Sequence, residues 1–330
     1  MDILLTIACC VIVLSVLVFI HEGGHFIASR LFGVRVTEFM LGLPGPNIGF
    51  KHGETKYGVT CIPLGGYARV CGMEAGNMKP HLKRVYEYML ENKKANANDV
   101  SNALNISEEA ASDCLFELFQ WGSVSENKDV FTINKFCKKT FKEEYFCQYR
   151  SLPFWKRIII LLAGIFVNLL FAMIIFVILY TLVGFDVKYQ DTGEIAHVTM
   201  NPLQAIQYGF NYIWLVIQAV VKLFNPATAA ETVNNSTSLI GIAVISKSAA
   251  ERGICAFMEF MAMISVSLGI MNLLPIPPLD GGKFIVEVIQ KITGKNVPER
   301  AVTLISIVGI ALFLLLFIVM ISQDIQRFIL

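Results

Sequence analysis

The sequence predicts a polytopic α-helical membrane protein with four transmembrane helices, a membrane-associated β-ribbon and a small cytosolic α+β insert that resembles a winged helix. Three observations indicate this fold class. Hydrophobic residues make up 55% of the 330 residues and charged residues only 16%, against roughly 25% charged residues in a globular domain. Four segments have the length of about 20 mainly apolar residues that spans a bilayer. A polar region with short β-like runs and amphipathic helical patterns separates the first two segments.

The overall composition excludes several classes of protein. A mean hydropathy of +0.60 rules out a disordered chain and an ordinary cytosolic enzyme. The net charge is +1, from 27 Lys+Arg and 26 Asp+Glu, which gives no basis for a nucleic-acid partner. None of the eight cysteines forms a Cys-x-x-Cys pair, so neither a zinc ribbon nor a disulfide framework is indicated.

The four predicted spans begin with residues 1–31. Their apolar part, residues 3–20, runs directly into a polar cluster that starts at His21. Asp2 stands where a secretory signal peptide would carry basic residues, and we therefore expect this segment to be a transmembrane helix rather than a signal peptide. The other predicted spans are residues 151–185, 254–282 and 302–330.

The charges of the connecting segments predict the orientation. The region from Arg30 to Arg157 holds 18 of the 27 Lys+Arg, whereas residues 186–253 hold four bases and five acids. Residues 283–301 add four more bases. By the positive-inside rule the first and third connections are cytosolic loops, and both termini lie outside. Residues 186–253 then form an outer loop, whose weaker apolar stretch at 208–224 is predicted to be an interfacial or re-entrant helix.

A β-ribbon is predicted for residues 32–78. Its candidate strands are separated by turns rich in Gly and Pro, and they lie at residues 34–41, 47–51, 55–62 and 66–70. A ribbon beside a membrane has unpaired edges, and such an edge can pair with another extended chain. The alternative is a plain cytosolic hairpin that packs against the helices.

The insert, residues 79–150, follows a helix–helix–turn–helix–hairpin pattern. The helices are expected at 81–94, 99–104 and 108–121, and the hairpin at 123–133. The insert carries 11 Lys+Arg and 11 Asp+Glu, and the helix that would enter a DNA groove has no base at all. Because DNA-binding domains have a basic surface, we expect no nucleic acid but a possible cytosolic protein partner, with an inert spacer as the alternative.

The polar cluster of the first span is an H-E-x-x-H motif formed by His21, Glu22 and His25. On a helix the two histidines share one face and can ligate one zinc ion, while Glu22 can act as a general base. Charged and polar residues at membrane depth are costly and point to function. The third ligand should be a carboxylate at the same depth: Asp280 qualifies, whereas Glu259 lies near the opposite end of its span.

The third span ends in a run that cannot continue as a helix. The run extends from Asn272 to Gly282 and includes Pro275 and Pro277. Prolines interrupt the helix and free backbone groups, and irregular backbone at membrane depth is tolerated where it is buried or lines a wet cavity. The run therefore predicts a water-accessible pocket close to Asp280.

Taken together, these motifs resemble the site-2 protease family of intramembrane zinc metalloproteases, in the bacterial branch that includes the regulator-of-sigma-E protease. The resemblance rests on the H-E-x-x-H motif, on the stretches 53–58 and 62–67 of the ribbon, and on residues 272–282. It implies one Zn²⁺ per chain, held by His21, His25 and Asp280, with Glu22 as the catalytic base. It further implies that the unwound substrate is bound by Asn272, Pro275, Pro277, Gly65, Gly66 and Tyr67, with the ribbon adding it as a strand.

The sequence also departs from this family. Relatives in the branch carry one or two PDZ domains between the second and third helices, and here about 70 residues fill that gap. Relatives tend to have Ala-Gly-Pro in the second helix, whereas here the residues are Ala163-Gly164-Ile165, followed by the matching Asn168. The insert at 79–150 has no counterpart in the family core.

The sequence thus predicts an intramembrane zinc endopeptidase in a bacterial inner membrane. By the resemblance, its substrate is a single-pass membrane protein of the anti-sigma factor or signal-peptide remnant type, cut within the lipid bilayer. Two alternatives stay open. A catalytically silent scaffold would have lost Glu22, and a metal transporter would need several more intramembrane His or Asp residues than the sequence holds.

Overall fold

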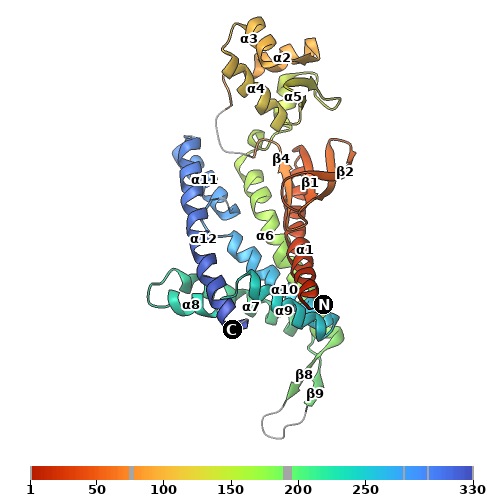
Figure 1. Cartoon of the computed structure of the whole chain (residues 1–330), viewed down its shortest axis with the longest axis vertical. Coiled ribbons are helices and arrows are strands. Elements are labelled where there is room, and N and C mark those ends of the chain that lie inside the picture. The colour runs from red at the N-terminus through yellow and green to blue at the C-terminus, as the bar shows by residue number, and fades with distance from the viewer. Residues whose placement is uncertain (1, 74–77, 189–194, 278, 296, 329–330) are drawn as a thin grey trace. The chain divides into compact units, whose positions relative to one another are not determined.

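The computed structural model describes residues 2–73, 78–188, 195–277, 279–295 and 297–328 (Figure 1). They form two compact units. The first unit comprises residues 1–21, 162–283 and 304–330, and the second comprises residues 22–161 and 284–303. The boundaries fall within continuous helices, and each unit is described separately.

Four helices in the described part of the chain are long and apolar enough to cross a membrane. They correspond to the four predicted segments and run over Ile3–Leu31, Phe154–Val183, Ile254–Asn272 and Arg300–Arg327. As elements these are α1 (Asp2–Leu31), α6 (Phe154–Ile178) with the π-helical turn η2 (Leu179–Val183), α10 (Ile254–Asn272) and α12 (Glu299–Phe328).

The first unit also contains shorter elements between α6 and α10. They are the hairpin β8 (Phe185–Lys188) and β9 (Ile195–Val198), then α7 (Pro202–Leu223), α8 (Ala229–Asn235) and α9 (Leu239–Glu251). The stretch 208–224, for which the sequence predicts an interfacial or re-entrant helix, falls largely within α7, which begins earlier. Asn201 and Gln204 form a capping box at its start, and Pro202 occupies the first turn, where a missing N–H costs nothing.

The core of the first unit lies where α6, α7 and α10 meet. Phe176 is fully buried there and contacts the rings of Tyr180, Tyr208 and Tyr212. A Cβ atom on Gly209 of α7 would lie 2.7 Å from the sulfur of Met173, so this glycine permits the close approach of α6. In a second cluster, Val13 and Leu17 of α1 pack with Met261 of α10.

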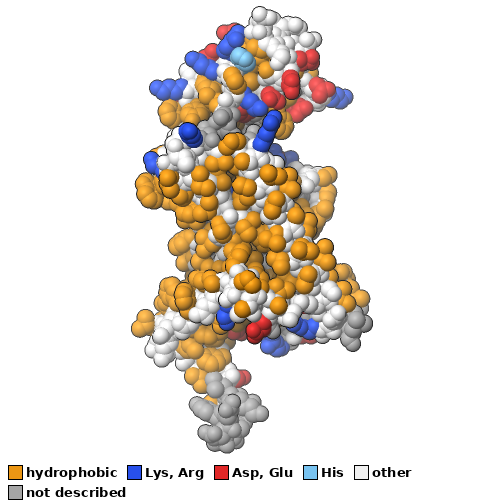
Figure 2. All heavy atoms as spheres, turned by 90° about the vertical axis from the view of Figure 1, so that its left-hand side faces the viewer, with side chains coloured by type: hydrophobic (Ala, Val, Ile, Leu, Met, Phe, Trp, Pro, Cys, Tyr) orange, Lys and Arg blue, Asp and Glu red, His pale blue; other side chains and the backbone are white. Residues whose placement is uncertain are grey.

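Helix α12 has a predominantly exposed apolar surface. Only 6% of its most apolar window is buried, and its exposed Leu, Ile and Val side chains contribute to the hydrophobic surface seen in Figure 2. Its C-terminal end, in contrast, is firmly attached. A carboxylate oxygen of Asp324 accepts the backbone N–H groups of Ser238 (2.7 Å) and Gly241 (3.0 Å), which lie at the start of α9, and the Ser238 hydroxyl (2.6 Å).

The second unit contains a four-stranded sheet where the β-ribbon was predicted. Its strands are β1 (Val36–Leu41), β2 (Asn47–His52), β3 (Thr55–Thr60) and β4 (Gly66–Val70), in the order β2-β3-β1-β4. β1 pairs with β3 in parallel and with β4 in antiparallel orientation. Strands that follow each other in sequence are therefore not always neighbours, and β4 and β2 form the two edges.

The segment predicted as the insert forms α2 (Leu82–Asn92), β5 (Lys94–Ala95), α3 (Ala97–Leu104), α4 (Glu108–Gln120), β6 (Val124–Asn127), β7 (Val130–Ile133) and α5 (Phe141–Phe146), followed by the 3-10 turn η1 (Tyr149–Ser151). Asn96 and Asp99 cap α3, and Ser107 caps α4. Lys128 and Asp129, with φ of 50° and 62°, make the tight turn between β6 and β7. Tyr86 and Met89 are fully buried in the core of this segment.

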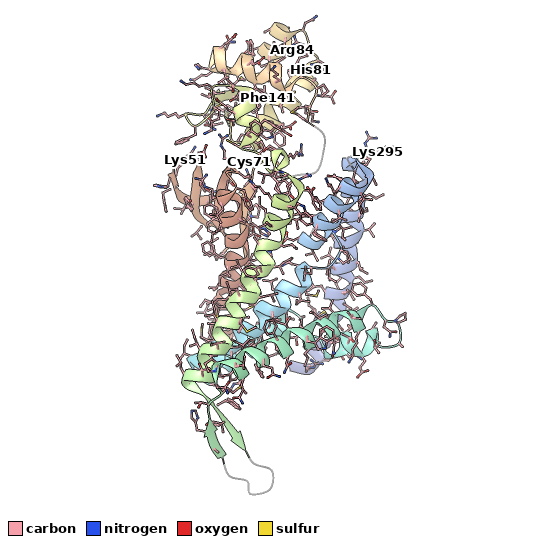
Figure 3. The ribbon with its side chains drawn as sticks, turned by 180° about the vertical axis from the view of Figure 1, so that it is seen from behind. Lys51, Cys71, His81, Arg84, Phe141 and Lys295 are labelled. Carbon is pink, nitrogen blue, oxygen red and sulfur yellow. The ribbon has the colours of Figure 1, made fainter. Side chains whose placement is uncertain are left out.

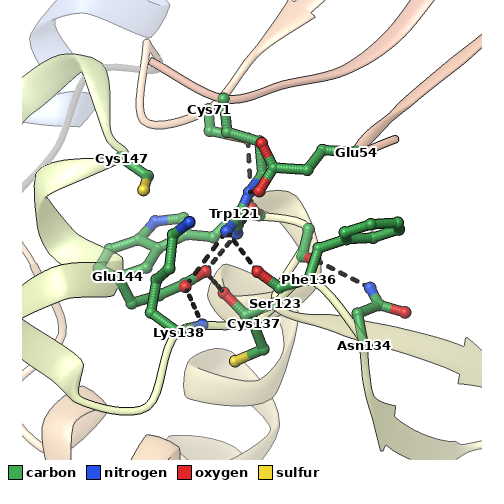
Figure 4. A network of polar contacts seen from close by, with 12 residues as sticks. Glu54, Cys71, Trp121, Ser123, Asn134, Phe136, Cys137, Lys138, Glu144 and Cys147 are labelled. Atoms are coloured by element: carbon green, nitrogen blue, oxygen red, sulfur yellow. Dashed lines mark hydrogen bonds and ion pairs between the residues drawn. The ribbon is translucent and has the colours of Figure 1, made fainter. Parts of the chain in front are cut away.

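A buried arginine joins the sheet to this segment within the second unit, and Figure 4 shows the network of polar contacts that includes its partners Glu54 and Glu144. Arg35, which precedes β1, is 2% exposed. It donates to Glu54 (3.0 Å), to both oxygens of Glu144, and to the carbonyls of Trp121 (3.1 Å) and Phe136 (3.2 Å). All its donor nitrogens are therefore engaged, and the guanidinium fixes the segment on the sheet.

Two further contacts support the same connection. Lys51 at the end of β2 lies 5.6 Å from the centre of the Phe136 ring, and the thiol of Cys71, just after β4, donates to the carbonyl of Trp121 at 3.2 Å. Both residues can be located in Figure 3.

The sequence predicts one span over 254–282 and a loop over 283–301, but the structure differs. α10 ends at Asn272, the chain then turns, and α11 (Asp280–Thr293) occupies much of the expected loop. The prolines end α10 because they lack an N–H to continue it. α11 is helical because its apolar residues recur at helical spacing, among them Ile285, Ile289 and Ile292, which are exposed as on an interfacial helix.

Candidate active site

The H-E-x-x-H motif lies on α1, which is continuous through it. His21 and His25 are one turn apart and are only 5% and 4% exposed. Nε2 of His21 is 2.9 Å from a carboxylate oxygen of Asp280. One ligand atom of each of His21, His25 and Asp280 lies within 4.8 Å of the others, and among the described residues they form the one group of three or more His, Cys, Asp or Glu side chains close enough to hold a metal ion.

The imidazole of His25 is oriented by α6. Its Nδ1 is 2.8 Å from the carbonyl oxygen of Ile160. Because a carbonyl only accepts hydrogen bonds, Nδ1 must carry a proton, and in the neutral ring Nε2 then keeps its lone pair. This is the tautomer that a metal ligand needs, held by a backbone acceptor.

The imidazole of His21 contacts Asn168, near the middle of α6. Nδ1 of His21 lies 3.4 Å from the amide nitrogen of Asn168, and the amide oxygen of Asn168 is buried and has no hydrogen-bond partner among the residues that the structure describes. A ligating Nε2 would require a proton on Nδ1, and a rotation of the amide would present the unpaired oxygen to it. The sequence matched Asn168 to the family but gave it no role. The sequence feature that could have identified Asn168 as functional is a single amide side chain within a 25-residue apolar helix.

Asp280 is held by a close chain reversal at the start of α11. A Cβ atom on Gly281 would lie 2.2 Å from the carbonyl oxygen of Leu273, and one on Gly282 would lie 2.2 Å from the nitrogen of Pro277. Only glycine allows the helix to start this close to the turn. Asp280 is 6% exposed, and its second oxygen is 3.6 Å from Nζ of Lys283.

Glu22 contacts the sheet rather than the metal-binding group. One of its carboxylate oxygens accepts the backbone N–H of Ala68 at 3.0 Å. Ala68 lies on the edge strand β4 together with Gly66 and Tyr67, and Gly65 precedes the strand with φ of 84°. Sequence reasoning placed three of these residues in substrate binding and missed Ala68, because no side-chain pattern reveals which backbone amide faces an edge.

The other predicted residues lie near the end of α10. Asn272 is the last residue of the helix and is half-buried, Pro275 is exposed, and Pro277 is buried in the turn. Glu259 is 13 positions before Asn272, or about 20 Å along a helix, and accepts the hydroxyl of Tyr180 at 2.6 Å. Glu259 is therefore not part of the metal-binding group.

The donor set fits zinc. Two imidazoles and one carboxylate, all buried, are the ligands of many hydrolytic zinc enzymes, in which a fourth position stays available for the reaction. The fixed tautomer of His25 and the unpaired amide oxygen of Asn168 agree with this assignment.

Comparisons with known proteins agree with the geometry. The family model of peptidase family M50 matches residues 9–316. A putative zinc metalloprotease of Clostridium acetobutylicum is 26% identical over 339 residues, covering 96% of each chain. A putative zinc metalloprotease of Campylobacter jejuni is 28% identical over 363 residues, covering 97% of this chain and 93% of that protein.

The regulator of sigma-W protease RasP of Bacillus subtilis is 25% identical over 420 residues, covering 98% of each chain. The family match extends over most of the sequence and includes the apolar helix with the H-E-x-x-H motif and the turn with Asp280. The chain therefore belongs to peptidase family M50, the site-2 protease family of zinc-dependent membrane metalloproteases.

Proposed function

We propose that this metalloprotease holds its zinc with His21, His25 and Asp280, uses Glu22 as general base, and cuts peptide bonds inside the membrane-spanning segments of its substrates. The observation that carries the residue assignment is the buried group of two histidines and one carboxylate, with Glu22 next to His21 on an apolar helix. Bound zinc supplies Lewis-acid polarisation of the scissile carbonyl.

The protein side chains supply the remaining chemistry. Glu22 accepts a proton from the attacking water and transfers it to the nitrogen of the leaving amine. The Ile160 carbonyl keeps His25 in its ligating tautomer, and the amide oxygen of Asn168, once the amide is rotated, would do the same for His21. The apolar helices around them limit the access of bulk water, which strengthens each of these interactions.

We further propose that the substrate is an unwound segment of a single-pass membrane protein. An extended segment can add to the edge of β4 beside Gly65, Gly66 and Tyr67, while Asn272, Pro275 and Pro277 bind it from the turn after α10. The relative from Bacillus subtilis is named a regulator of sigma-W protease. On that basis the substrate class is a membrane-bound anti-sigma factor, or a signal-peptide remnant.

The chain is proposed to lie in a bacterial inner membrane with both termini outside and residues 32–150 in the cytosol. The 18 Lys+Arg between Arg30 and Arg157 support this orientation. The proposed winged-helix resemblance of the insert at 79–150 is supported by helices that precede a hairpin, and the insert carries equal numbers of acids and bases. We assign it a cytosolic protein partner rather than nucleic acid, and we place no PDZ domain in the chain.

A cleavage assay with the purified full-length chain tests the proposal. The chain in detergent is incubated with a single-pass membrane protein, and the products are mapped by mass spectrometry. We expect cuts inside the membrane-spanning segment that cease after zinc chelation and return when zinc is restored. Cuts confined to soluble segments, or cleavage that survives chelation, would refute it.

A further inference from the structure

The carboxylate of Glu22 is bound by the edge of the β-sheet. The backbone N–H of Ala68 donates to it at 3.0 Å. The backbone N–H of Gly42 donates to the carbonyl of Gly65 at 2.8 Å. Together with the register of β1 and β4, this bond shows which residues of β4 direct their backbone groups toward β1 and which direct them away. In an antiparallel pair every second residue directs its backbone groups away from the neighbouring strand. Ala68 is such a residue, so its N–H belongs to the free edge of β4.

A peptide strand that adds to this edge needs the same N–H group. Strand addition is built on the outward backbone groups of the edge strand, which on β4 are those of Gly66 and Ala68. A backbone N–H makes one well-aligned hydrogen bond. Glu22 and an added strand therefore compete for Ala68.

The structure leaves β4 ready for a second strand. Gly66 has no side chain and Ala68 only a methyl group, so another backbone can approach closely. The longer side chains of β4 are held on the sheet, because both Tyr67 (2.9 Å) and Arg69 (3.4 Å) contact the carboxylate of Glu38.

We propose that the Glu22–Ala68 hydrogen bond is a latch that substrate binding opens. The inference rests on the proposed function of Glu22 as general base. In the free protein the carboxylate is held by Ala68. When an extended peptide pairs with β4, the Ala68 N–H passes to a carbonyl of that peptide, and the carboxylate is released to accept the proton of the attacking water. A segment that stays helical cannot pair with β4 and leaves Glu22 bound, so the base becomes free only beside an unwound substrate.

The first test measures the latch without cleavage. Amide hydrogen exchange at Ala68 is compared in two zinc-loaded, full-length variants that both lack the base. Glu22→Gln keeps an oxygen that can accept from Ala68, and Glu22→Ala has none. We expect Ala68 to exchange roughly tenfold faster in Glu22→Ala, with the exchange of Tyr67, which faces β1, equal in both. Equal exchange of Ala68 in the two variants would overturn the latch.

The second test measures the competition. The probe is a fluorescent ten-residue peptide rich in Val and Thr, and the control is the same peptide with N-methylated backbone amides, which cannot pair as a strand. We expect Glu22→Ala to bind the probe roughly tenfold more tightly than Glu22→Gln, because no bond to Ala68 must first be broken. Neither variant should bind the N-methylated peptide.

A third variant shows whether the difference depends on the Ala68 amide. Ala68→Pro removes the outward N–H, a change that edge strands tolerate. In that background Glu22→Ala and Glu22→Gln should bind the probe equally, and a difference that persists would refute the proposal. If Ala68→Pro does not fold, the exchange measurement alone decides. These tests use variants without the base, so their failure is separate from a failure of zinc-dependent cleavage.

Discussion

His21 has a polar partner at each of its two ring nitrogens. Its Nε2 lies 2.9 Å from Asp280, and its Nδ1 lies 3.4 Å from the amide of Asn168. If Nε2 were to bind zinc, the proton would have to be on Nδ1, and the amide oxygen of Asn168 would have to turn toward it as acceptor. At the scale of the residue, we therefore propose Asn168 as a positioning group for His21, the proposed metal ligand.

We expect Asn168→Leu to weaken zinc binding by about 10–100-fold, the usual cost of losing such a partner. Zinc content is measured by competition with a chelator on the purified variant, with circular dichroism to verify the fold. Asn168→Asp, which keeps an acceptor beside Nδ1, is the matched control and should retain most of the affinity. Unchanged zinc affinity in Asn168→Leu would contradict the role.

The Glu22→Gln variant separates metal binding from proton transfer. Its amide preserves the shape of the side chain but cannot accept the proton of the attacking water, so we expect normal zinc content and a loss of cleavage by at least 10²-fold. Asp280→Ala should lose zinc as well as cleavage, since it removes a proposed ligand. Near-normal turnover in Glu22→Gln would refute the assignment of the base.

At the scale of elements, Arg35 is the main connection between the sheet and residues 79–150. Burial alone would lower the pKa of Arg35, but its ion pairs with Glu144 and Glu54 outweigh burial and keep the pKa above its ordinary value. Glu144 is itself fully buried and also accepts from Ser123 at 2.6 Å. Removal of Arg35 leaves the buried carboxylate of Glu144 without its ion-pair partner.

Arg35→Met should therefore lower the free energy of unfolding by about 3–5 kcal/mol. Arg69→Met is the control, because the Arg69–Glu38 pair is partly exposed and such pairs contribute about 0–1 kcal/mol. Urea denaturation in detergent gives both values. The double variant Arg35→Met, Glu144→Met should recover part of the loss, since it leaves no unpaired charge.

Labelling of the Cys71 thiol tests the same connection between the sheet and residues 79–150. Burial raises the pKa of its thiol to about 12, so at pH 8 only about one thiol in 10⁴ is ionised. Because the thiolate is the reactive form, Cys71 reacts appreciably only when the pH approaches this raised pKa. Cys61, in contrast, is exposed. We expect maleimide at pH 8 to label Cys61 but not Cys71 in the native protein, and to label Cys71 once Arg35→Met has loosened the connection.

At the scale of the whole molecule, the distribution of charge predicts how the chain lies in the membrane. Ser125 and Glu231 are exposed and lie in segments assigned to opposite sides. In intact cells, a membrane-impermeant maleimide should label Glu231→Cys but not Ser125→Cys, and both should react after the cells are opened. Mass spectrometry distinguishes these sites from the native cysteines. The opposite pattern would reverse the orientation and the cytosolic assignment of the insert.

The sequence by itself predicted the four apolar spans and the strands of the ribbon, and it led to His21, His25 and Asp280 as the proposed metal ligands. These are local properties. Apolar length defines a span, the i and i+4 spacing places His21 and His25 on one face of a helix, and alternation with turn residues marked strands such as β4 within a few residues of their bounds. The role of Glu22 is predicted from the H-E-x-x-H motif, and that of Asp280 from its predicted depth in the membrane. Measurements of zinc content and of cleavage rate test these two predictions.

Only the tertiary structure decided which distant groups meet. The parallel pairing of β1 with β3, the contact of Asn168 with His21 and the bond from Ala68 to Glu22 each join residues that are far apart in the chain. They depend on how helices and strands pack, and packing leaves no periodic pattern in the sequence. A backbone N–H in particular has no residue type to identify it, because every residue except proline carries one. The free edge of β4 beside Glu22 could for that reason be found only in the folded chain.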